Sequence, residues 1–156
     1  MRIVRMTPTV AIAAVLLTAA RPASAGECKP VFGHFTSSPV AIGCSSPVGF
    51  CTAGRLIGGI QGSYAFTMLT AAPAAIPNPA GVTFYTGRSE VSLDHGGTVV
   101  LADAGAIDLN PFGSGKMAAL LSVTGGATSG FLQLRGSIDF VTGGVTGDYF
   151  GEICGP

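Results

Sequence analysis

Glycine is concentrated in one part of the chain, and its spacing there limits the fold more than any other feature. All 24 glycines follow residue 25. Between them, Val, Ile, Thr, Phe and Tyr recur at every second position, in runs bounded by Gly, Pro, Asn and Ser. This alternation is typical of short strands, and glycines inside strands mark bends, bulges or close backbone approach. The sequence therefore predicts an all-β protein.

The expected strands account for most of the chain. Segments over 71–81 and 108–116, rich in Pro, Gly or Asn, separate some of them as loops. The long run over 55–69 needs a break, so we expect seven or eight strands. The segment 117–121 contains helix formers, but the Val-Thr that follows favours a strand. The predicted strands cover 31–37, 55–69, 82–93, 98–109, 117–124, 131–142 and 145–154.

The beginning of the chain has the features of an export signal. Two arginines precede an uncharged apolar run over 10–20, and Ala-Ser-Ala at 23–25 has the small-x-small form of a signal peptidase site. The apolar run is too short to cross the roughly 30 Å hydrocarbon core of a bilayer as a helix. We therefore expect 1–25 to be a cleaved signal peptide and 26–156 a single domain. The mature protein would be secreted or periplasmic.

The charge balance argues against two classes of partner. Residues 1–25 hold three of the eight Lys and Arg and none of the eight Asp and Glu, which leaves five basic and eight acidic residues and a net charge of about −3. Nucleic acids and anionic membranes both favour clustered Lys and Arg. We expect no nucleic-acid partner and no membrane association after signal cleavage. The sequence does not predict the oligomeric state.

The cysteines point to disulfides rather than to a metal. All of them, Cys28, Cys44, Cys51 and Cys154, lie in the exported part, where an even number indicates two disulfides with three connectivities. Zinc would require closer ligand spacing, such as Cys-x-x-Cys, and the two histidines are far apart in sequence. We expect neither a metal site nor a cofactor.

The last two strands permit a prediction of register. Glycines at 143 and 144 suit a two-residue hairpin turn, which needs positive φ. This turn would set Arg135 opposite Glu152 and Ile138 opposite Tyr149. Apolar side chains then share one face and polar side chains the other, as in a half-buried sheet.

An antiparallel sheet of this size can remove its edges by closing on itself. We therefore predict a closed antiparallel up-and-down β-barrel of about eight strands. The start of the first strand would lie beside the end of the last, which favours the disulfides Cys28–Cys154 and Cys44–Cys51. If the strand beginning at residue 55 closes the barrel instead, Cys28 pairs with Cys44 and Cys51 with Cys154. We favour the first pairing, and the second stays open.

The segment GRLIGGIQGSYAF over 54–66 has four glycines in thirteen residues, a density also found in phosphate-binding loops. Neither G-x-G-x-x-G nor G-x-x-x-x-G-K-[ST] is present, and 63–68 alternates like a strand instead of opening a helix. We interpret the segment as barrel wall. Its Gly58 and Gly62, which share the parity of Tyr64 and Phe66, would mark bends or close backbone approach.

Six segments resemble a known family. They are CTAGRLIGGIQGSYAF (51–66), GVTFYTGRSEV (81–91), DAGAIDL (103–109), LLSVTGGATSGF (120–131), LQLRGSIDF (132–140) and TGDYFGEIC (146–154). Together they are similar to secreted bacterial proteins with an allene oxide cyclase barrel-like domain, related in fold to plant allene oxide cyclases and dirigent proteins. The resemblance implies an eight-stranded barrel with a central cavity. The plant relatives guide cyclisation or radical coupling of small hydrophobic molecules there, but no catalytic motif of theirs aligns with this chain.

Two sets of side chains compete for the inner wall. Polar residues, if they face inward, would supply acid–base groups and arginines that orient a substrate; if they face outward, they would form cross-strand ion pairs. We expect the apolar set to face inward, because it must be buried. The candidate ligand-binding residues are Tyr64, Phe66, Leu134, Ile138, Phe140 and Tyr149. The candidate catalytic residues are Arg88, Glu90, Asp103, Arg135 and Asp139.

These patterns favour an exported barrel that binds a small hydrophobic ligand. One alternative is an extracellular structural or interaction scaffold without catalytic activity. Another is a cofactor-independent isomerase or cyclase, which would need at least two charged residues in the cavity. The sequence favours a protein that is not an enzyme, because no G-x-S-x-G or similar catalytic motif occurs.

Overall fold

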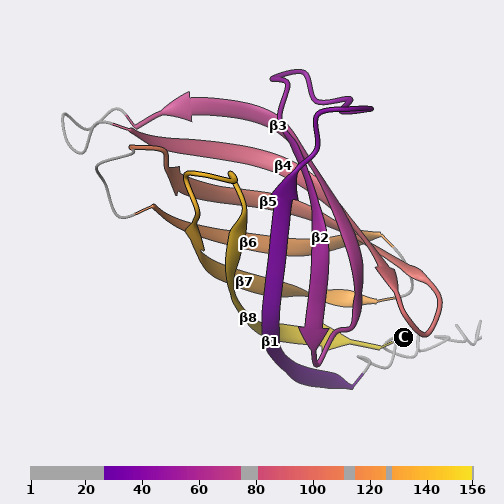
Figure 1. Ribbon diagram of the computed structural model, residues 1–156. Helices are drawn as coiled ribbons and strands as arrows, with labels where there is room; N and C mark the ends of the chain where they lie inside the picture. Colours follow the sequence, from indigo (N-terminus) through magenta and orange to yellow (C-terminus); the bar gives the residue numbers. More distant parts are fainter. Residues whose placement is uncertain (1–26, 75–80, 111–114, 126–127, 156) are drawn as a thin grey trace, which may run out of the picture.

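The chain forms a closed antiparallel β-barrel in which each strand pairs with the next and β8 returns to β1 (Figure 1). The computed structural model describes residues 27–74, 81–110, 115–125 and 128–155. The predicted up-and-down barrel is confirmed. Its strands are β1 (Cys28–Pro39), β2 (Cys51–Gly58), β3 (Gly62–Pro73), β4 (Val82–Leu93), β5 (Thr98–Asp108), β6 (Lys116–Gly125), β7 (Ser129–Ile138) and β8 (Val145–Cys154).

Some predictions fall on residues that the structure does not describe. The expected signal peptide, 1–25, lies wholly outside the described residues, as do 75–80 and 111–114 within two of the expected loops. Among the described residues, no helix is long and apolar enough to cross a membrane. The segment 117–121, where helix and strand competed, belongs to β6.

The long run over 55–69 is broken at its glycines. β2 ends at Gly58, which has a φ of +127°, and a Cβ there would lie 2.6 Å from the Phe32 carbonyl oxygen. A Cβ at Gly62, the first residue of β3, would lie 2.4 Å from the Ser92 carbonyl oxygen. Both glycines therefore stand where neighbouring backbone comes too close for a side chain, as predicted.

β3 is longer than expected. It continues to Pro73, into the segment predicted as a loop, and its register with β4 shifts between Met68 and Thr70. Proline lacks an amide hydrogen, so it is tolerated at a strand end, where one ladder hydrogen bond can be lost. The strand end predicted from the Pro-rich composition of 71–81 was therefore too early in the sequence.

The predicted register of the last hairpin is wrong by four residues. Arg135 lies opposite Asp148 rather than Glu152, and Tyr149 lies opposite Leu134 rather than Ile138. The cause is a wider turn over 139–144, organised by the carboxylate at its first position: Oδ1 of Asp139 accepts from the Val141 amide at 2.8 Å, and Oδ2 accepts from the Thr142 hydroxyl at 2.9 Å. A shift of four keeps the parity, so the same side chains still face inward.

The set of alternate residues that is mostly apolar faces the inside of the barrel, as predicted. Tyr149, Leu101 and Leu132 have the largest fully buried side chains. The Tyr149 side chain of β8 lies over Gly33 of β1 and reaches the turn between β2 and β3, where its hydroxyl accepts from the Ile60 amide at 2.8 Å and donates to the Ile60 carbonyl at 2.9 Å. A Cβ at Gly33 would lie 2.6 Å from the Tyr149 hydroxyl, so this glycine gives the ring its room.

Two disulfides reinforce the barrel. Cys28–Cys154 joins residues that face each other directly across β1 and β8, and Cys44–Cys51 ties the connection between β1 and β2 to the start of β2. The favoured pairing is confirmed. The first disulfide closes the seam between the first and last strands.

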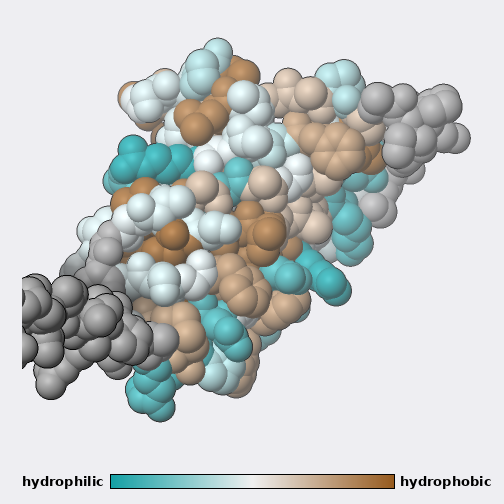
Figure 2. Space-filling view, turned by 180° about the vertical axis from the view of Figure 1, so that it is seen from behind, coloured by the Kyte–Doolittle hydropathy of each residue, from teal (hydrophilic) through white to brown (hydrophobic). Residues whose placement is uncertain are grey.

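The outer wall mixes polar and apolar side chains (Figure 2). Phe32 of β1 is 74% exposed and lies directly opposite Phe150 of β8, which is 43% exposed. Charged side chains on the same surface form pairs, including Arg55 with Asp94 at 2.7 Å.

Candidate functional site

The interior of the barrel contains a cavity of about 70 Å³. A buried water needs about 10–15 Å³, so the space exceeds a water or two. All eight strands contribute side chains to its wall, and most of these are apolar. The apolar lining includes Phe35, Leu56, Met68, Met117, Leu121 and Leu134.

A second, larger hollow of about 510 Å³ lies at the end of the barrel where the described chain begins and ends, and Glu27 and Gly155 are part of its lining. Val91, Leu101 and Leu132 line both spaces. We call these three residues the waist, because they form the partition between the two hollows. Each is at most 2% exposed, so the waist is a packed apolar layer.

One carboxyl group interrupts the apolar wall of the inner cavity. Asp103 of β5 is 5% exposed, and its Oδ2 accepts a hydrogen bond of 2.5 Å from the Ser89 hydroxyl of β4. Its Oδ1 is buried without a hydrogen-bond partner among the described residues. Burial disfavours the charged form and raises the pKa of Asp103 to about 7, although the Ser89 hydrogen bond lowers it.

Two glycines beside Asp103 make room for aromatic rings. Gly87 lies directly opposite Asp103 on β4, and a Cβ there would lie 2.2 Å from Cε2 of Phe66. Gly105 is the next inward position on β5, and a Cβ there would lie 2.7 Å from the Tyr85 hydroxyl oxygen. The ring atoms farthest from the Cβ atoms of Phe66 and Tyr85 therefore lie over the backbone of Gly87 and Gly105, on two sides of the Asp103 carboxyl.

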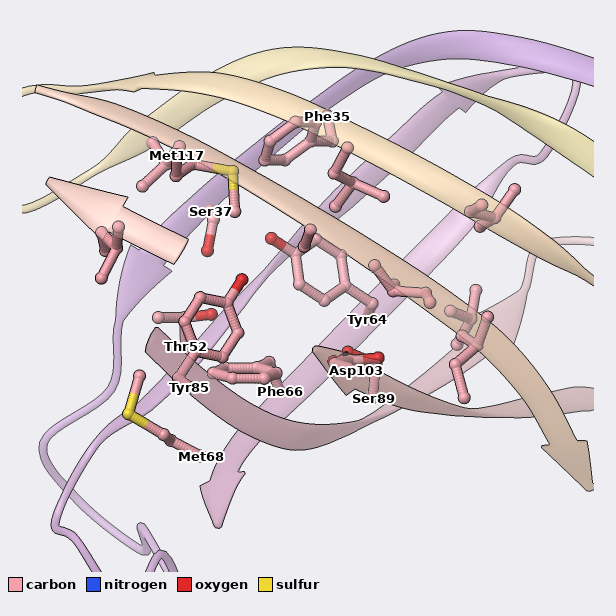
Figure 3. Close-up of a pocket in the computed structure, with 18 of the residues that line it drawn as sticks. Phe35, Ser37, Thr52, Tyr64, Phe66, Met68, Tyr85, Ser89, Asp103 and Met117 are labelled. Atoms are coloured by element: carbon pink, nitrogen blue, oxygen red, sulfur yellow. Dashed lines mark hydrogen bonds between the residues drawn. The ribbon is translucent and has the colours of Figure 1, made fainter. Parts of the chain in front are cut away.

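The aromatic side chains also contact each other. The rings of Phe66 and Tyr85 meet edge to face, with centroids 5.6 Å apart and planes at 74°. Figure 3 shows them in the same part of the cavity as Tyr64, Asp103 and Ser89. Edge-to-face pairs of this kind fix ring positions.

Two tyrosines supply hydroxyl groups to the cavity. Burial is the largest cause of the raised pKa of Tyr64, whose hydroxyl interacts with the side chains of Ser37 and Thr52. Burial also raises the pKa of Tyr85, with a further contribution from the charge of Asp103. Both phenols therefore stay neutral at physiological pH.

The structure distributes the predicted ligand-binding residues unequally. Tyr64, Phe66 and Leu134 line the inner cavity. Tyr149 is buried, with its hydroxyl engaged by Ile60, and Ile138 is partly buried against the core. Phe140 lies in the turn between β7 and β8 and is 43% exposed, because β7 ends two residues before it.

Of the predicted catalytic residues, Asp103 alone lines the cavity. Arg88 and Glu90 pair with each other on the outer wall at 2.7 Å. The guanidinium carbon of Arg135 lies 5.8 Å from the centre of the Phe150 ring, also outside. Asp139 organises its turn, where amide and hydroxyl hydrogen bonds lower its pKa. The five residues therefore do not form one site.

Four of the polar residues in the described lining of the cavity were not among the predicted site residues. They are Ser37, Thr52, Tyr85 and Ser89. For the last two, a signal was present: residues 85, 87, 89 and 91 of β4 share one parity, opposite to that of Arg88 and Glu90. Apolar Val91 at the end of this series indicates that the parity faces inward.

Comparison of the chain with protein-family models, curated proteins and solved structures found no match. Within the described part of the chain, no three His, Cys, Asp or Glu residues come together as a metal site would require.

Proposed function

We propose that the barrel binds a small hydrophobic molecule in its inner cavity. The observation that carries this proposal is the unfilled interior: a closed barrel whose wall is largely apolar still leaves about 70 Å³ free. Eight-stranded barrels of this size either fill their interior with side chains or hold one small ligand. Here the rings of Phe66 and Tyr85 already occupy the space over Gly87 and Gly105, and the cavity remains beside them.

The lining indicates the character of the ligand. Apolar walls favour a hydrophobic body, because transfer of apolar surface out of water is favourable by roughly 25 cal/mol per Å². The described polar residues of the lining lie on β1–β5: Ser37, Thr52, Tyr64, Tyr85, Ser89 and Asp103. A ligand with an apolar body and one polar group fits this distribution.

The proposal also includes a family relationship and a cellular location. Two disulfides are compatible with an oxidising compartment, and together with the sequence of 1–25 they support export. The barrel agrees with the fold implied by the resemblance to allene oxide cyclase barrel-like proteins. We include that relationship and a secreted or periplasmic location in the proposal.

Native mass spectrometry of protein purified from its own host tests the binding. We expect a co-purifying small molecule on the wild-type protein. Ala119→Leu places a larger side chain in the cavity, next to Gly105 and Leu134, and should remove that molecule. Ala118→Leu adds the same group to the exposed outer face and should retain it. A barrel that is empty in all three proteins contradicts the proposal.

The scaffold alternative has one specific observation in its favour. Phe32 and Phe150 are exposed and adjacent on the outer wall, which suits contact with another protein. If the native barrel proves empty, this becomes the better function. The isomerase or cyclase alternative has less support, since the described lining contains a single charged residue, Asp103.

A further inference from the structure

The carboxyl group in the wall of the inner cavity lacks the partners that a buried charge normally has. Asp103 is buried with one oxygen bonded to Ser89 and the other without a partner among the described residues. No Lys, Arg or His is among the described residues that line this cavity. A buried carboxylate is normally paired with a cation or fully hydrogen-bonded, because an isolated charge is costly to desolvate. This one has neither.

We propose that the inner cavity selects a small protonated amine with an apolar body, whose ammonium group binds Oδ1 of Asp103. This inference rests on the proposed function, since it names the class of ligand for the same cavity. The amine supplies the positive charge that the described wall does not. Asp103 is already desolvated in the folded protein, so binding adds a partner without burying that carboxyl further.

Aromatic side chains border Asp103 on two sides. The ring ends of Phe66 and Tyr85 lie over Gly87 and Gly105, the inward neighbours of Asp103 on two sides. An ammonium group has three N–H donors. Asp103 Oδ1 would accept one of them.

Other ligand classes fit the cavity less well. A carboxylate ligand would be repelled by Asp103 and would find no cation in the described lining. A divalent metal needs several oxygen or nitrogen ligands, and one carboxylate does not provide them. A neutral alcohol would make a hydrogen bond without balancing the charge.

The charge on Asp103 should control amine binding. The titratable groups that face it are the phenols of Tyr64 on β3 and Tyr85 on β4, and both remain neutral below pH 10 because their pKa values are raised. On β6, Asp103 faces the apolar Leu121. The carboxyl therefore titrates without another charged group beside it, and its protonation below pH about 7 removes the negative charge that an ammonium needs.

The test uses three probes with the same four-carbon chain: butylamine, 1-butanol and butyrate. Their binding to the intact disulfide-bonded protein is followed by NMR of the methyl groups of Leu121, Leu134 and Met117 in the wall. We expect butylamine to bind at least about tenfold more tightly than 1-butanol, since hydrogen bonds to charged groups are the stronger ones. Butyrate should bind least.

Asp103→Asn keeps the shape and the Ser89 hydrogen bond but removes the charge. It should weaken butylamine binding at least about tenfold and change 1-butanol binding by less than about twofold. Glu90→Gln, which alters the neighbouring acid on the outer wall, should leave all three affinities unchanged. For wild type, butylamine binding should also weaken between pH 8 and pH 5, across the pKa of about 7, while 1-butanol binding should not.

The outcomes separate the two proposals. If 1-butanol binds but butylamine binds no better, or if Asp103→Asn weakens both equally, the amine inference is wrong and the hydrophobic cavity stands. If none of the probes affects the cavity methyls, and xenon does not either, both proposals fail. Should Asp103→Asn fail to fold, Ser89→Ala replaces it: the carboxylate then has no partner, and the preference for butylamine should persist or increase.

Discussion

The hydroxyl of Ser89 donates a hydrogen bond of 2.5 Å to Oδ2 of Asp103, across the β4–β5 pair and inside the barrel. It satisfies one oxygen of a carboxyl in the cavity wall and leaves the other buried without a hydrogen-bond partner among the described residues. One hydrogen bond does not offset the desolvation of a carboxylate, which explains why the pKa of Asp103 remains raised.

The first prediction concerns stability against pH. In the unfolded chain Asp103 loses its proton near pH 3.8, whereas in the folded barrel it keeps the proton until about pH 7. Between these values the folded state binds more protons, so the free energy of unfolding falls as pH rises and levels off above pH about 7. The difference between 3.8 and about 7 corresponds to a loss of the order of 4 kcal/mol.

Urea unfolding at pH 4.5 and pH 7.5, followed by circular dichroism, measures this effect. Asp103→Asn should be less sensitive to pH than wild type across this interval, because it removes the titrating group. Glu90→Gln should keep the wild-type dependence, since Glu90 is an exposed member of an ion pair. If Asp103→Asn and wild type have the same pH dependence, ionisation of Asp103 does not destabilise the folded barrel, and the prediction is wrong.

The second prediction concerns the glycine under Phe66. Gly87→Ala should destabilise the barrel by roughly 1–3 kcal/mol, the usual cost of overpacking, because the new methyl group would lie 2.2 Å from the Phe66 ring. Displacement of that ring should also perturb the cavity resonances in NMR spectra. The matched control is Gly125→Ala on β6, where the nearest atom would be 3.4 Å away. Equal stability of the two variants would contradict the close packing.

The third prediction concerns the waist. Leu132→Ala should lower the free energy of unfolding by roughly 2–5 kcal/mol, because Leu132 is 1% exposed and borders both hollows. The loss should also join the two hollows, so that ligands longer than the inner cavity bind to the variant. Leu120→Ala, at a position 47% exposed, should cost far less. A crystal structure of Leu132→Ala that still shows two separate spaces would refute the partition.

The fourth prediction compares the disulfides. Constraint of the unfolded chain contributes roughly 5 kcal/mol for a sequence separation of 126 and roughly 2 kcal/mol for a separation of 7. The double variant Cys28→Ser and Cys154→Ser should therefore unfold at lower urea concentration than the double variant Cys44→Ser and Cys51→Ser. The reverse order would indicate that the connection between β1 and β2 holds more of the stability than the seam.

Much of the fold was predictable because strand parity is a local property. Alternation in 55–69 placed Tyr64 and Phe66 on the inner wall, and the requirement that a sheet bury its edges led to closure. Register was less predictable. Asp139 recruits the Val141 amide and the Thr142 hydroxyl and widens the turn, and this competes with the tight turn that the glycines would allow.

The candidate site was predictable only in part. Charge marked Asp103 as a candidate, but equally marked Arg88 and Glu90, whose parity on β4 points outward. The inward polar residues Ser89 and Tyr85 carry no charge, so composition did not distinguish them from ordinary wall residues. What singles out Asp103 is its cross-strand position opposite Gly87, which depends on the pairing of β4 with β5 and cannot be read from one strand alone.

The Cys28–Cys154 bond has a consequence for how the molecule can be cut and reopened. It joins β1 to β8, so the covalent path from Cys28 through every strand to Cys154 returns to its start as a ring around the barrel. A protease cut in an exposed turn such as 94–97 would leave one covalently connected molecule with all strands retained. Connecting the native ends and opening the chain at that turn should therefore yield a circular permutant with the same barrel.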